Sequence, residues 1–140
     1  MANKIPTVKQ LTQIAVELQK IMRIQDFDVV VLIKTKEEIS EGEEGEIQGR
    51  YFLSLINNTL YISICDEVQD WYLTLVHELK HCQTRNTHEL ACHFTDLIDA
   101  NDNTKNGYDL YINYYEQLID KQAKEFVNIY PRRKFNHILR

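Results

Sequence analysis

Two histidines four residues apart, His77 and His81, constrain the fold of this chain more than any other feature. They belong to a His-Glu-Leu-Lys-His segment that ends an apolar stretch, residues 71–76, whose length and pattern predict a buried helix. Side chains four positions apart lie one above the other on the same face of a helix, so both imidazoles can bind one metal ion. The segment therefore predicts a metal-binding helix at about residues 68–83, capped by Asp66 or Asp70.

Glu78 lies between the two histidines in the sequence and is the natural base for a water bound to such a metal. Catalytic zinc usually takes three protein ligands and keeps one position for water, so the pattern predicts Zn²⁺ as the cofactor. Short motifs also arise by chance. The alternative is two helix histidines satisfied by ordinary hydrogen bonds, with Glu78 in solvent. The apolar neighbours of the motif favour the metal-binding interpretation: Tyr72, Leu73, Val76 and Leu79.

Length, charge and cysteine content limit the class of protein. The chain has 140 residues, which predicts one domain over 1–140, and its net charge of −5 argues against nucleic acid as a partner. Three cysteines without a CxxC spacing favour a reducing compartment. No segment has the pattern of a signal peptide or the length of a membrane span, so we expect a cytoplasmic protein with no membrane partner.

The remaining pattern predicts an α+β fold. Thr7 can cap a helix that extends to about residue 22, and residues 27–33 form a short β-branched strand. Residues 36–49 are expected to form a loop, and two strands, 50–56 and 59–65, surround the turn residues Asn57 and Asn58. A helix at about 87–100, a polar loop at 101–107 and a long helix at about 109–129, ended by Pro131, complete the chain. The expected order is an N-terminal helix, a small antiparallel sheet, the histidine helix and a C-terminal helix that closes the site.

The third metal ligand must come from downstream of the motif. The candidates are His88, His93, Glu116, Asp120 and Glu125. A metzincin would have Gly and His where this chain has Thr84 and Thr87, which excludes that class. His88 and His93 lie about 140° apart on a helix, so we interpret both as surface or packing residues.

The C-terminal helix is the better source of the third ligand. Its apolar stripe consists of Ile112, Tyr115, Ile119, Ala123, Phe126 and Tyr130. On a helical wheel Glu116 lies about 60° and Asp120 about 100° from the centre of that stripe. The two acids are one turn apart, so both can approach the metal, and the wheel slightly prefers Glu116.

The motif, followed some forty residues later by residues 119–127, resembles the gluzincin-type ImmA/IrrE family and related small phage-encoded metallopeptidases. Their second motif is approximately Ile-Glu-x-Glu-Ala-x-x-Phe-Ala. Ala123 and Phe126 match it, whereas Asp120 replaces the first Glu, Gln122 the second Glu and Val127 the last Ala. This match, which covers roughly residues 59–130, puts Asp120 at the ligand position, and we choose Asp120 on that basis. A thermolysin-like ExxxD pattern would instead make Glu116 the ligand and Asp120 the partner of a histidine.

The resemblance implies a zincin-like zinc metallopeptidase that hydrolyses a cytoplasmic protein, in a phage or mobile-element setting. Glu78 would be its general base, and a tyrosine would stabilise the oxyanion. The tyrosine candidates are Tyr111, Tyr114 and Tyr115. One alternative is a zincin-shaped binding module that acts by occupying a partner. Another is an SprT-like nucleic-acid-associated protease with His88 or His93 as third ligand. The oligomeric state is left open by the sequence.

Overall fold

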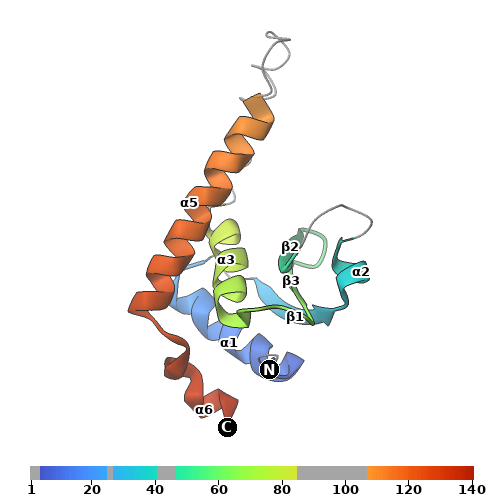
Figure 1. Cartoon of the computed structure of the whole chain (residues 1–140). Helices are drawn as coiled ribbons and strands as arrows, with labels where there is room; N and C mark the ends of the chain where they lie inside the picture. Colours follow the sequence, from blue (N-terminus) through green and yellow to red (C-terminus); the bar gives the residue numbers. More distant parts are fainter. Residues whose placement is uncertain (1–3, 25–26, 41–46, 85–106) are drawn as a thin grey trace.

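The computed structural model describes residues 4–24, 27–40, 47–84 and 107–140; for 107–114 it describes only the backbone. The elements in chain order are α1 (Val8–Ile21), β1 (Asp28–Lys34), α2 (Lys36–Ser40), β2 (Gly49–Ser54), β3 (Thr59–Cys65), α3 (Trp71–Gln83), α5 (Gly107–Ile129), the 3-10 helix η1 (Arg132–Phe135) and α6 (Asn136–Leu139). The predicted α+β class is confirmed (Figure 1). The helix and the polar loop predicted at 87–107 lie almost wholly outside the described residues. Among the helices described, none is both long and apolar enough to cross a membrane.

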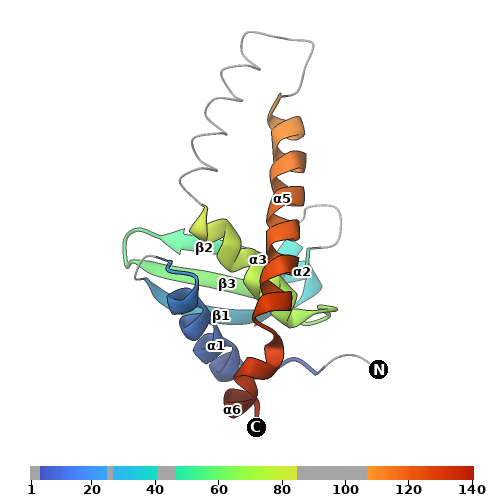
Figure 2. The ribbon, with the colours of Figure 1, turned by 90° about the vertical axis from the view of Figure 1, so that its left-hand side faces the viewer.

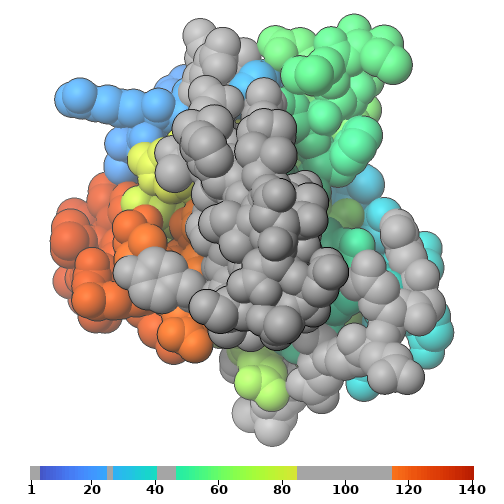
Figure 3. All heavy atoms as spheres, turned by 90° about the horizontal axis from the view of Figure 1, so that it is seen from above, coloured from blue at the N-terminus to red at the C-terminus, as the bar shows by residue number. Residues whose placement is uncertain are grey.

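The sheet has three strands in the order β1-β3-β2, with β3 in the centre. β2 pairs antiparallel with β3, so the predicted antiparallel edge is confirmed, but β1 pairs parallel with β3 and the sheet is mixed. The reason is that α2 and β2 lie between β1 and β3 in the sequence, and this longer connection returns the chain in the same direction. Seen from above, the green β2–β3 hairpin projects at one corner of the molecule (Figure 3).

The hairpin turn is longer than predicted. β2 ends at Ser54, and residues 55–58 form the turn, in which Asn58 has a φ of 53°. Asn tolerates this left-handed conformation better than most residues. Leu55 and Ile56, predicted as the end of a strand, therefore belong to the turn and are 76% and 100% exposed.

The core lies between one face of the sheet and the helices α1 and α3. Thr7 caps α1 as predicted, because its side chain accepts a hydrogen bond from the Gln10 amide and the Gln10 side chain accepts one from the Thr7 amide. The buried face of α1 packs on the sheet, and fully buried residues from all three elements meet there: Leu11, Ile14, Leu18, Leu60, Ile62, Ile64, Leu75, Val76 and Leu79.

α5 runs antiparallel to α3 and packs along it (Figure 2). At one end the Tyr72 hydroxyl, from the start of α3, donates a hydrogen bond of 2.6 Å to the carbonyl of Tyr130, just after α5. Beyond Pro131 the chain turns back, and Phe135 is fully buried against the rings of Tyr72 and Tyr130. Phe135, together with the hydrogen bond that the Gln10 side chain donates to the Ile138 carbonyl, thus holds the C-terminal segment to the core.

Replacing Tyr72 by Phe tests this attachment of α5. The variant leaves the Tyr130 carbonyl without its buried donor, and we expect it to lower the free energy of unfolding by about 1–2 kcal/mol. Urea unfolding followed by circular dichroism measures the change. The control is Tyr61→Phe, which removes only an exposed contact with Asn57. Equal stability of Tyr72→Phe and wild type would show that this hydrogen bond does not hold the two helices together.

Candidate metal centre

Local sequence determines where α3 begins and ends. Asp70 is the N-cap, since its side chain accepts a hydrogen bond of 3.0 Å from the Leu73 amide; of the two predicted caps, the structure has this one. The helix begins at Trp71, slightly later than predicted, and ends at Gln83. At its C-terminal end the Thr84 hydroxyl donates to the Lys80 carbonyl. Both histidines thus lie on one regular helix, as predicted.

The two imidazoles and one carboxylate converge on a single point. His77 Nε2 lies 3.2 Å from His81 Nε2, and the Glu116 carboxylate oxygens lie 3.2 Å from His77 Nε2 and 3.0 Å from His81 Nε2. Two nitrogens bound to one tetrahedral zinc at about 2.0–2.1 Å are roughly 3.3 Å apart. The His77–His81–Glu116 group therefore has the spacing of metal ligands.

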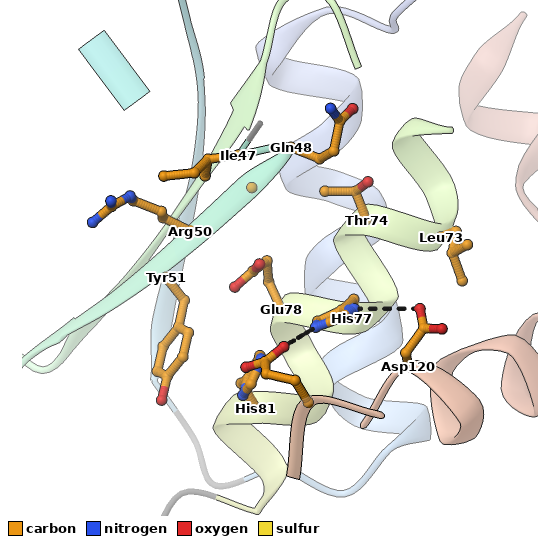
Figure 4. A pocket seen from close by; sticks show the side chains of 12 residues that line it. Ile47, Gln48, Arg50, Tyr51, Leu73, Thr74, His77, Glu78, His81 and Asp120 are labelled. Carbon is orange, nitrogen blue, oxygen red and sulfur yellow. Dashed lines mark hydrogen bonds and ion pairs between the residues drawn. The ribbon is translucent and has the colours of Figure 1, made fainter. Parts of the chain in front are cut away.

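Asp120 does not lie at the ligand position that the family match predicted for it. Its Oδ1 lies 3.9 Å from His77 Nδ1, the ring nitrogen that points away from the group, and its Oδ2 lies 2.8 Å from Lys124 Nζ (Figure 4). Asp120 is thus positioned to orient the His77 ring, and the alternative ligand, Glu116, occupies the position at the two Nε2 atoms. The structure favours the ExxxD pattern over the match that selected Asp120.

The axial offset between α3 and α5 explains this exchange of roles. The buried face of α5 includes Tyr115, Ile119 and Ala123, as the apolar stripe predicts. Because the helices are antiparallel, Glu116 lies level with the space between the two histidines, and Asp120, one turn on, lies beside the far side of His77. The fully buried Ala123 lets the two helices approach closely without changing this offset.

The His81 ring is held between two aromatic rings. Tyr51 of β2 stacks on it at a centroid distance of 5.5 Å, and Tyr115 of α5 packs at 5.4 Å. Tyr115 also forms a hydrogen bond with the Thr84 hydroxyl, which fixes its own ring. Tyr115, a predicted oxyanion donor, therefore has a positioning role in this structure, while the side chains of Tyr111 and Tyr114 lie outside the described residues. Tyr51 could not be selected from the sequence, because no sequence signal distinguishes it from the other tyrosines.

Glu78 points from α3 toward β2, into the cavity that His77 and His81 also line (Figure 4). Glu78 is only 8% exposed. Burial raises the pKa of its carboxyl group to about 7, although the charge interactions with His81 and His77 lower that pKa. Gly49 makes this burial possible. A Cβ atom at Gly49 would lie 2.6 Å from Thr74 Cγ2 and 3.3 Å from the Glu78 side chain, so only glycine lets β2 approach this closely.

The charges of the ligand group are coupled. Burial lowers the pKa of His77, but the hydrogen bond to Glu116 and the nearby carboxylates outweigh it, so the pKa of His77 is raised overall. Hydrogen bonds from His77 and His81 lower the pKa of Glu116 to about 2. Without metal, a proton on His77 thus stabilises the group, and a metal ion must displace that proton.

An open cavity of about 640 Å³ gives access to the site between β2, α3 and α5. Its lining includes Gln48, Tyr51, Leu73, Glu78, Glu116 and Asp120. Of the other ligand candidates, Glu125 is exposed on α5 and is not in the group, and His88 and His93 lie outside the described residues. Comparison of the chain with protein-family models, curated proteins and solved structures finds no match.

Zinc titration of two α5 variants tests the ligand assignment. Glu116→Ala removes a donor at both Nε2 atoms, so we expect it to lose most of the zinc affinity. Asp120→Ala removes the contact to His77 Nδ1 and the exposed ion pair with Lys124 but no atom at the two Nε2 atoms, and its affinity should fall by roughly 10–100-fold. A larger loss in Asp120→Ala than in Glu116→Ala would return the ligand role to Asp120.

A second prediction concerns the approach of β2 to the helix. Gly49→Ala forces the strand or Thr74 to move, and we expect it to lower the free energy of unfolding by roughly 1–3 kcal/mol. Combining it with Thr74→Ser, which removes the clashing methyl group, should recover much of that loss. Thr74→Ser alone is the matched control. If the double variant is as unstable as Gly49→Ala, the contact with Thr74 is not the reason for glycine.

Zinc affinity should fall as the pH is lowered. The raised pKa of His77 means that the proton competing with zinc stays bound to a higher pH than on a free imidazole. Affinity should therefore rise with pH up to the pKa of His77 and decrease by roughly tenfold for each pH unit below it, per proton displaced. Competition with a zinc indicator at several pH values measures this slope. An affinity independent of pH through this range would exclude His77 as a ligand.

Proposed function

We propose that the protein is a zinc-dependent peptidase with His77, His81 and Glu116 as ligands and Glu78 as general base. The observation that supports this most strongly is the convergence of three side chains, whose facing nitrogen and oxygen atoms lie 3.0–3.2 Å apart, beside a buried carboxylate at an open cavity. Two imidazoles and a carboxylate are the donor set of catalytic zinc in thermolysin-type enzymes. The resemblance of residues 77–81 and 119–127 to small phage-encoded metallopeptidases agrees with this activity.

The ligand group fits zinc in donor type and spacing. A zinc ion held there supplies a Lewis acid that polarises the scissile carbonyl and makes a bound water more acidic. The Asp120 carboxylate lies 3.9 Å from His77 Nδ1, and the rings of Tyr51 and Tyr115 pack on the His81 ring. These contacts leave both Nε2 atoms directed at the same point, which reduces the cost of ordering the ligands when metal binds.

Glu78 is the residue that moves protons. Its pKa of about 7 in the metal-free protein, raised by burial, shows an environment in which the carboxylate is a stronger base than in water. It accepts a proton from the attacking water and returns it to the leaving amine. It lies between α3 and β2 and lines the same cavity as His77, His81 and Glu116, so it can reach a water molecule at the site.

β2 provides a place for an extended substrate. It is one of the two edge strands of the sheet in the described part of the chain, and it lies along the cavity next to Glu78 and His81. An edge strand has backbone donors and acceptors that can pair with another extended segment. We therefore propose that the substrate is a protein or peptide bound in extended form along β2, in the cytoplasm of a host for phage or mobile elements.

Glu78→Gln tests the activity. Gln keeps the shape of the side chain but cannot accept the proton, so we expect unchanged zinc stoichiometry with hydrolysis reduced by roughly 10²–10⁴-fold. A peptide library of known sequences serves as the substrate, and mass spectrometry detects cleavage. His77→Ala is the control that loses both zinc and activity. A zinc-loaded wild type that cleaves nothing would favour a binding module, and equal activity of Glu78→Gln and wild type would remove Glu78 from catalysis.

A further inference from the structure

Three exposed apolar side chains lie at the far end of the edge strand. Phe52 of β2 is 65% exposed, and Leu55 and Ile56 of the following turn are 76% and 100% exposed. We call these three residues the hairpin surface. Turns usually contain Gly, Asn, Asp, Ser or Pro, so adjacent Leu and Ile in a turn give the fold no burial and no favourable turn geometry.

Two contacts with Tyr61 hold Phe52 and the backbone of the turn on one side of the hairpin. Alternation along β2 directs Tyr51 to α3 and Phe52 to the opposite face of the sheet, where Phe52 stacks on its cross-strand partner Tyr61 at 6.5 Å. The Asn57 side chain donates to the Tyr61 hydroxyl at 3.1 Å, which ties the turn to the same face. Apolar groups exposed together are typical of interaction sites.

The edge strand connects this surface to the candidate metal centre. β2 begins at Gly49, which lies against Glu78. Tyr51, two residues further on, stacks on His81, and the strand ends at Ser54, where the turn begins. From Gly49 to Ser54 it advances roughly 17 Å, at about 3.3 Å per residue. A single extended segment paired with β2 would therefore contact the metal site with one part and the hairpin surface with another.

From this continuity we propose that the hairpin surface is an exosite for an apolar segment of the same substrate that is cleaved at the metal centre. The proposal rests on the proposed peptidase function. Antiparallel pairing is slightly more stable than parallel pairing, and it directs the substrate residues N-terminal to the cleaved bond toward the turn. The substrate should thus have one or more large apolar residues about four to six positions N-terminal to the scissile bond.

The test compares wild type with Leu55→Ser/Ile56→Ser on peptides. The best cleaved sequence from a peptide library is shortened one residue at a time from its N-terminal end, and KM and kcat are measured for each length. For wild type we expect KM to rise about tenfold when the distal apolar residues are removed, with kcat little changed. The double variant should show the high KM at every length, with unchanged zinc affinity. Ile129→Ser, which changes an 80% exposed residue on α5, is the matched control.

Each other outcome overturns the proposal in a distinguishable way. If wild type cleaves peptides but length has no effect, or the double variant retains the length effect, the exosite is wrong and the peptidase function stands. If zinc-loaded wild type cleaves none of the library, the proposed function fails and the exosite fails with it. If sedimentation shows a wild-type dimer that the double variant loses, the hairpin surface joins two copies of the chain instead.

Discussion

The antiparallel packing of α3 on α5 is the interaction on which the candidate site depends. It is fixed at one end by the Tyr72–Tyr130 hydrogen bond and at the other by the contact of Thr84 with Tyr115. The offset that these contacts impose brings Glu116 to the two histidines. A shift of one turn, about 5.4 Å, would bring Asp120 there instead. The chemistry of the site is thus determined by how two helices are aligned.

Features that depend on residues close together in the sequence, such as helix caps and the buried faces of helices, could be predicted from the sequence. The Thr7 cap, the α3 helix with both histidines on one face, and the buried stripe of α5 follow from spacing alone, because each depends on neighbours within one or two turns. The ligand on α5 could not be chosen in this way. The helical wheel gives the angular positions of Glu116 and Asp120 around α5. Only tertiary packing determines their positions along the helix axis relative to His77.

The contribution of β2 was also beyond the reach of sequence patterns. Gly49 was assigned to a glycine-rich loop, whereas its lack of a side chain allows β2 to cover Glu78. Tyr51 was one tyrosine among eight, and only the fold brings its ring onto His81. Leu55 and Ile56 have the composition of a strand, but the four-residue turn leaves them in solvent. In each case the role comes from contacts between segments far apart in the sequence.

In the proposed site one zinc ion binds between α3 and α5 through two imidazoles and a carboxylate. X-ray absorption spectroscopy of protein loaded with one equivalent of zinc measures these ligands. We expect two imidazole nitrogens and oxygen ligands, all at about 2.0–2.2 Å, with no sulfur. A sulfur ligand at about 2.3 Å, as Cys82 next to His81 would provide, would contradict this ligand set, as would the absence of stoichiometric zinc binding.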